Sequence, residues 1–169
     1  MNEMLLEVCV DGVDFDSDTE LDVIGRHFAD WGWSAIDGQI VISVSGSFDP
    51  VAEALRIAAA LQEVLPGARV VRWHEDFVGY SEIAQRAGVS REAVRLWAKS
   101  MRGPQDFPAA RGYVGAGDRR SPLWTWAAVA TWLGENDVFE DQYTYPSERQ
   151  VAEINWALMR LRDREVVGV

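Results

Sequence analysis

Residues 80–99 carry the most specific pattern in the chain, Tyr-Ser-Glu-Ile-Ala-Gln-Arg-Ala-Gly-Val-Ser-Arg-Glu-Ala-Val-Arg-Leu-Trp-Ala-Lys. Ser81 is expected to cap a short helix, and Ser90 a second one. Gly88 stands between them, where the chain must leave the first helix with a positive φ that glycine adopts without a Cβ penalty. Apolar or small residues are expected to face inward on both helices and at the corner: Ile83, Ala84, Ala87, Val89, Val94 and Trp97. The sequence therefore predicts a helix-turn-helix.

The second of these helices is the element that enters the DNA major groove when a helix-turn-helix binds DNA. Its expected exposed residues are Ser90, Arg91, Glu92, Arg95 and Lys99. Arg91 and Arg95 lie four positions apart on one side, so both could reach base edges or phosphates, and arginine to guanine is the commonest specific pairing. The alternative is a plain helical hairpin with solvated arginines, which also occurs in enzymes and in protein-contact modules.

The segment 102–122 is rich in glycine, proline and arginine and predicts a β-hairpin wing. Its tip is expected at residues 117–120, between two short strands. Arginines at such a tip suit the phosphate backbone or a minor groove. The candidate DNA-binding residues of this segment are Arg102, Arg111, Arg119 and Arg120.

Aromatic residues surround the wing, and a helix is expected over 127–133. The members of this group are Phe107, Trp124, Trp126, Val129 and Trp132. At this spacing they are interpreted as the core beneath the wing, with base stacking by the tryptophans as the alternative.

The combination of residues 81–98, Phe107-Pro108, Leu123-Trp124 and Val-Ala-Thr-Trp-Leu at 129–133 resembles the MerR-like winged helix-turn-helix, especially its AlpA and excisionase branch. The resemblance covers residues 77–134. It implies DNA binding in transcription or in directing site-specific recombination, with the residues that match Arg91, Arg95 and the wing arginines contacting DNA. The chain departs from that branch by its long N-terminal extension and its acidity.

The N-terminal extension, residues 1–75, predicts a ferredoxin-like domain with the order β-α-β-β-α-β. The expected elements are a strand at 4–10, a helix at 19–30, a hairpin at 33–44 turning at Asp37-Gly38, a helix at 50–65 and a strand at 68–73. On the first helix, Leu21, Ile24 and Phe28 are expected to face inward. This fold hosts many functions, so the expected role is protein contact or dimerisation, with a small-ligand sensor as the alternative. The acidic residues between positions 14 and 22 lack the glycine and spacing of a calcium loop and are interpreted as a solvated loop and helix start.

Charge is distributed unevenly along the chain, whose net charge is −11. Residues 1–75 sum to −10 and residues 135–169 to −4, whereas residues 76–134 sum to +3. The only basic segment is thus the one with the helix-turn-helix. The flanking acidity is expected to weaken non-specific DNA affinity.

Residues 135–169 predict an acidic linker and an amphipathic helix. Ser147 and Gln150 form a capping box, and the apolar seam is Val151, Ile154, Leu158 and Leu161. The MerR resemblance favours a homodimer through such a helix, while packing back onto its own chain is the alternative. Which element dimerises stays open at this stage.

Other functional classes find little support. Cys9 is the only cysteine, which excludes an internal disulfide and leaves no cysteine cluster for zinc. His27 and His74 have no nucleophile motif nearby, and no phosphate loop is present. We therefore expect a cytoplasmic α+β protein that is not an enzyme, needs no cofactor or metal, contacts no membrane and binds double-stranded DNA. The alternatives are a protein-interaction or inhibitor module and a recombination directionality factor.

Overall fold

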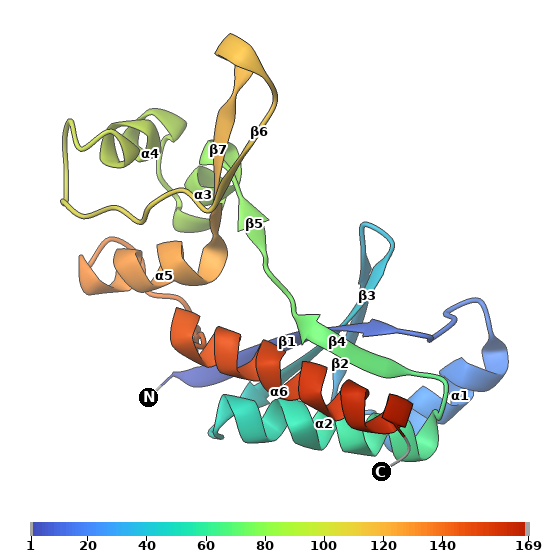
Figure 1. Ribbon diagram of the computed structural model, residues 1–169. Coiled ribbons are helices and arrows are strands. Elements are labelled where there is room, and N and C mark those ends of the chain that lie inside the picture. Colours follow the sequence, from blue (N-terminus) through green and yellow to red (C-terminus); the bar gives the residue numbers. More distant parts are fainter. Residues whose placement is uncertain (1, 168–169) are drawn as a thin grey trace. The chain divides into compact units, whose positions relative to one another are not determined.

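The computed structural model describes residues 2–167, with side chains described for residues 2–163, and this part of the chain is α+β with six α-helices and antiparallel sheets (Figure 1). It divides into two compact units. The split unit is made of two separate stretches, the residues up to His74 and those from Tyr145 onward. The inserted unit is the continuous stretch between them, Glu75–Thr144.

The split unit is built on an antiparallel sheet whose strands follow the order β2-β3-β1-β4. Its elements are β1 (Glu3–Asp11), α1 (Asp18–His27), β2 (Gly32–Ile36), β3 (Gln39–Gly46), α2 (Pro50–Val64), β4 (Arg69–Trp73) and α6 (Glu148–Val167). The six elements expected between residues 4 and 73 are all present. The β1–β4 register shifts between Cys9 and Val10, where a bulge interrupts the pairing.

Local signals set the boundaries of these elements. Asp37 and Gly38 have φ values of 50° and 79°, so both central residues of the β2–β3 turn adopt the positive φ of a turn that matches the twist of its flanking strands. Asp49 caps α2 by accepting the Ala52 N–H at 2.8 Å, and Pro50 occupies the first turn, where no N–H is needed.

The helix α1 is shorter than predicted. It ends at His27 rather than Asp30, because Phe28 leaves the helical conformation while its N–H still bonds to the Ile24 carbonyl. The expectation that Leu21 faces inward is wrong, since its exposed fraction is 42%. The helix meets the core only through its C-terminal end, where Ile24 and Phe28 are buried.

Alternate residues of the strands form one core with the helices. The main members are Leu6, Val8 and Val10 of β1, Ile42 of β3, Ile57 and Leu61 of α2, and Ile154 and Leu158 of α6. Burial of each such side chain stabilises the unit by roughly 1.5–3 kcal/mol relative to exposure. The core of the split unit therefore draws on both of its stretches.

The C-terminal helix packs on its own chain. Ile154 and Leu158 are fully buried, and Val151 and Leu161 pack against the same core. The Asn155 side chain accepts the backbone N–H of Trp73 at 2.7 Å, which ties α6 to β4. The predicted capping box is confirmed, because Ser147 N–H donates to the Gln150 side chain and Gln150 N–H to Ser147 Oγ. The predicted apolar seam is thus occupied within the molecule.

The inserted unit combines three helices with a small antiparallel sheet of order β5-β7-β6 (Figure 1). Its elements are β5 (Phe77–Val78), α3 (Tyr80–Ala87), α4 (Arg91–Ala98), β6 (Gly112–Val114), the 3₁₀ turn η1 (Gly117–Arg119), β7 (Ser121–Thr125), α5 (Trp126–Glu135) and β8 (Tyr143–Thr144). The two-residue strands β5 and β8 were not predicted, because so short a strand shows no alternation. Figure 1 shows the β6–β7 hairpin projecting beyond the helices of this unit.

Candidate nucleic-acid interface

The turn between α3 and α4 has the geometry that the sequence predicts. Gly88 has a φ of 67°, and Val89 N–H bonds to the Ala84 carbonyl at 3.0 Å. Ser90 caps α4 by accepting the Ala93 N–H at 3.1 Å. The prediction that Ser81 caps α3 is wrong: the cap position is Gly79, whose N–H donates to the Glu82 carboxylate at 3.0 Å. The helix begins one residue before Ser81, so that residue is already inside it.

A substitution at Gly88 tests the conformational requirement. Gly88→Ala should destabilise the protein by about 1–2 kcal/mol, because an alanine at positive φ is strained although open space surrounds the added Cβ. Gly88→Asn is the control and should cost less, since asparagine tolerates this conformation. Chemical denaturation of the full chain measures both. Equal stability of wild type and Gly88→Ala would contradict the assigned turn.

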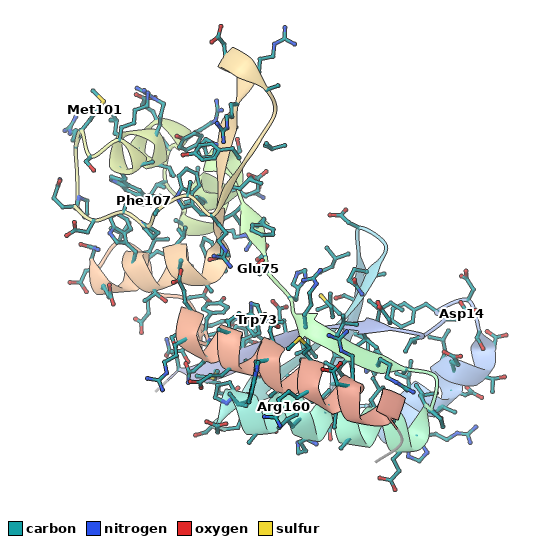
Figure 2. All side chains as sticks on the ribbon, viewed as in Figure 1. Asp14, Trp73, Glu75, Met101, Phe107 and Arg160 are labelled. Atoms are coloured by element: carbon teal, nitrogen blue, oxygen red, sulfur yellow. The ribbon has the colours of Figure 1, made fainter. Side chains whose placement is uncertain are left out.

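A cluster of aromatic side chains packs on the buried side of α4. Trp97 of α4 lies 5.4 Å from Trp132 of α5, centroid to centroid, and Phe107 lies 4.9 Å from Trp132 and 5.5 Å from Trp124. Figure 2 labels Phe107, which lies between these elements. The indole N–H groups of Trp124 and Trp132 donate to the carbonyls of Pro108 and Gln105, both at 2.8 Å. These bonds fix the loop after α4 to the core.

The predicted tryptophan-rich core is confirmed. Trp124, Trp126 and Trp132 are 3–5% exposed, Val129 is fully buried and Phe107 is half-buried. Phe107 packs edge-to-face with Trp124 and Trp132, and the burial of the three tryptophans does not support base stacking by them.

The outer surface of α4 is polar and charged. Val94 and Trp97 are buried, whereas Ser90, Arg91, Glu92 and Lys99 are exposed. Arg95 is half-buried, and its guanidinium Nε donates to the Glu92 carboxylate at 2.7 Å. That hydrogen bond lowers the pKa of Glu92 and raises the pKa of Arg95, so both remain charged at neutral pH. The Arg91 guanidinium lies over the Tyr80 ring, 5.9 Å from its centroid.

The β6–β7 hairpin presents two of the predicted arginines in different ways. Arg119 lies at the exposed tip in η1, whereas Arg120 folds back over the Tyr113 ring at 4.2 Å. Gly115 has a φ of 88°, and a Cβ there would lie 2.7 Å from the Arg119 carbonyl, so the tip requires glycine at this position. At the tip, Arg119 is therefore exposed without an aromatic partner among the described cation–π contacts, whereas Arg120 lies over the Tyr113 ring.

Two of the predicted arginines lie outside the helix and the tip. Arg111 precedes β6 and pairs with Glu75 at 3.2 Å, which places it at the base of the hairpin rather than among the exposed cations of α4. Arg102 is exposed in the loop after α4, next to Met101, which is 67% exposed and labelled in Figure 2. Sequence reasoning missed the partners Tyr80, Tyr113 and Glu75. Each of these pairs joins residues from different helices, strands or loops, so no spacing within one element pointed to them.

Comparison with protein-family models, with curated proteins and with solved structures found no match. The assignment of this surface consequently depends on its geometry and charge.

Three further observations concern metal ligands, the Cys9 thiol and membrane-spanning helices. Across the described residues, no three His, Cys, Asp or Glu side chains gather closely enough to hold a metal ion. Cys9 Sγ lies 3.7 Å from His74 Nδ1 in the split unit, and burial raises the pKa of the Cys9 thiol. No described helix is both long and apolar enough to cross a membrane.

Proposed function

We propose that the protein is a sequence-specific DNA-binding transcriptional regulator. In this proposal the inserted unit is a MerR-like winged helix-turn-helix, with α4 as the helix that enters the major groove and the β6–β7 hairpin as the wing. The split unit is a ferredoxin-like module. Its strand order β2-β3-β1-β4, with all neighbours antiparallel, supports this assignment.

One observation carries the proposal. A left-handed glycine turn leads into a Ser90-capped helix that buries Val94 and Trp97 and leaves a cationic outer surface. The same unit presents Arg119 at the tip of a hairpin. A groove-sized helix and a separate basic projection are the two parts that a winged helix-turn-helix uses on DNA.

The ion pair between Arg95 and Glu92 is compatible with a role for Arg95 in contacting base edges. Glu92 holds the Arg95 guanidinium at the α4 surface, which reduces the side-chain freedom that would be lost on binding. Arg91 and Arg95 are therefore assigned to base contacts, and Lys99, Arg102, Arg119 and Arg120 to phosphates and sugars. Arg111, which pairs with Glu75, is assigned to holding the wing base.

The proposal is tested by binding of the purified full chain to DNA from the region upstream of its own gene, at low and moderate salt. We expect a discrete complex that persists over competitor DNA and weakens steeply with salt. Arg95→Ala should weaken it by roughly 5- to 150-fold and relax sequence preference at one position. Arg119→Ala should weaken all sequences alike and reduce the salt slope by about one.

Arg26→Ala is the matched control, because Arg26 is a 73%-exposed arginine on α1 of the split unit. It should leave DNA binding unchanged. The proposal fails if neither the upstream fragment nor random DNA binds at low salt. It also fails if reversing both Arg95 and Arg119 to glutamate leaves the affinity intact, and a protein-interaction module would then be the better assignment.

A further inference from the structure

The strand β2 forms an open edge of the sheet in the split unit. In the order β2-β3-β1-β4 it pairs with β3 on one side, and no described strand pairs with it on the other. Ile36 and Gln39 flank the two-residue turn and form a hydrogen-bonded pair, and such pairs then alternate with non-bonded pairs along the strand. The backbone N–H and C=O groups of Trp33 and Ala35 therefore point away from β3. They are a template for one more strand.

The two edges of this sheet differ in how they are protected. At the β4 edge, the Trp73 N–H already donates to Asn155 of α6 at 2.7 Å, and the strand carries Arg69 and Arg72. A covering helix and charged side chains are common protections against strand addition. In contrast, β2 has the sequence Gly-Trp-Ser-Ala-Ile, with no charged residue and no proline, and four of its five residues are exposed. The edge at β2 is therefore the one that is open to a partner.

Trp33 is a second indication of an incomplete site. Its indole N–H is buried, and no described residue accepts a hydrogen bond from it. A buried donor without an acceptor is costly, and an oxygen atom of a bound partner would satisfy it. The ring centroids of Phe15 and Trp31 lie 6.3 and 6.4 Å from that of Trp33. The open strand thus carries the central member of an aromatic group.

The acidic residues near β2 favour a basic partner. Asp30 precedes the strand by two residues and Asp37 follows it directly; both are exposed, and neither has an ion-pair partner among the described residues. Asp14, which Figure 2 labels, and Asp16 flank Phe15 and are also exposed. Lysine or arginine on a partner would meet opposite charge at both ends of the strand. A second copy would instead bring like charges together, which disfavours pairing of two β2 edges.

We propose that β2 binds an extended basic segment of another protein, which adds to the sheet as a further strand. The backbone of the segment bonds to Trp33 and Ala35, and every second side chain packs beside the aromatic group. Basic residues at its two ends meet Asp30 and Asp37. Strand addition of this kind takes its affinity from main-chain hydrogen bonds and its specificity from alternate side chains. The proposal does not rest on DNA binding, and its test involves none.

The probes are synthetic peptides Lys-Arg-X-Thr-X-Thr-X-Arg-Lys, in which X is Val, Ile, Leu or Phe. They are titrated against the full chain by fluorescence anisotropy up to about 1 mM, the weak end of specific binding. At least one should bind saturably. Amide hydrogen exchange, followed by NMR, should then slow at Trp33 and Ala35, whereas Ser34, which already bonds to β3, should change little.

Two matched peptides separate strand addition from simple charge attraction. One has methylated backbone nitrogens at the X residues and the other at the Thr residues, so both keep the full charge. Because N–H groups alternate between the two sides of a strand, only one of these sets faces β2. One methylated peptide should therefore lose binding and the other should keep it.

Variants of the protein test the edge and its charges separately. Ala35→Pro removes one outward N–H and leaves the bonds to β3 in place, so it should weaken peptide binding about tenfold or more. Asp30→Asn with Asp37→Asn should weaken it about threefold at low salt. Asp22→Asn is the matched control, because Asp22 is a 73%-exposed acid on α1 of the same unit, and it should leave binding unchanged. Urea denaturation checks that each variant stays folded.

Three results would overturn the proposal: no peptide binds at about 1 mM, both methylated peptides bind as tightly as their parent, or Trp33 and Ala35 gain no protection on binding. Protection of these two amides in the free protein that rises with protein concentration would also overturn it, because a second copy would then occupy the edge.

Discussion

Trp132→Ala is expected to destabilise the inserted unit by about 3–5 kcal/mol, the usual cost of removing a buried tryptophan side chain. Trp132 is 5% exposed and lies at the centre of the aromatic cluster, against Trp97 and Phe107. Its indole N–H also donates to the Gln105 carbonyl at 2.8 Å. Truncation therefore leaves a cavity beneath α4 and releases the loop that follows this helix.

The measurement is urea denaturation followed by circular dichroism, with hydrogen exchange to locate the loss of protection in residues 75–144. The neighbouring Thr131→Ala is the control; Thr131 is exposed, and the change should stay within about 0.5 kcal/mol. A similar stability for both variants would contradict the packing described for this cluster. In the proposed function, DNA binding by Trp132→Ala should fall in parallel with its folded fraction.

Leu158→Ala should destabilise the split unit by about 2–5 kcal/mol. Leu158 is fully buried and packs into the core formed with the sheet and α2, although it lies 84 residues after the end of the first stretch. The expected loss of hydrogen-exchange protection is therefore in residues 3–73 as well as in α6.

Met159→Ala is the adjacent control and should change stability by about 0.5 kcal/mol or less, because Met159 is 44% exposed. Both variants are compared at the same protein concentration. If Leu158→Ala left the exchange of β1 and β4 unaltered, α6 would not be part of that core.

Local patterns predicted most of the helices and strands. Asp37-Gly38, Asp49-Pro50 and Gly88-Val89-Ser90 each determine a turn or a cap through residues a few positions apart, so the sequence alone locates them. The error at Ser81 has the same local origin, because Gly79 and Glu82 form an equivalent cap two residues earlier.

The side-chain partners of the candidate site were not predictable in the same way. Arg91 on Tyr80 and Arg111 on Glu75 depend on how α3, α4 and β6 pack, which no short-range spacing encodes. The partner of α6 posed the same problem. Its apolar seam was evident from the spacing, but only the packing of Ile154 and Leu158 shows that the seam covers its own chain.

The division of the split unit into two stretches has a consequence for biosynthesis. The sheet and α2 leave the ribosome with residues up to 74, but Leu161, the last of the core residues of α6, follows 87 residues later. At about 5–20 residues per second, the apolar surface that α6 covers waits roughly 4–17 s for its partner. The inserted unit, which is one continuous stretch of chain, can fold within that interval. The nascent chain is thus expected to present a folded downstream unit while its upstream core is still incomplete and open to chaperones.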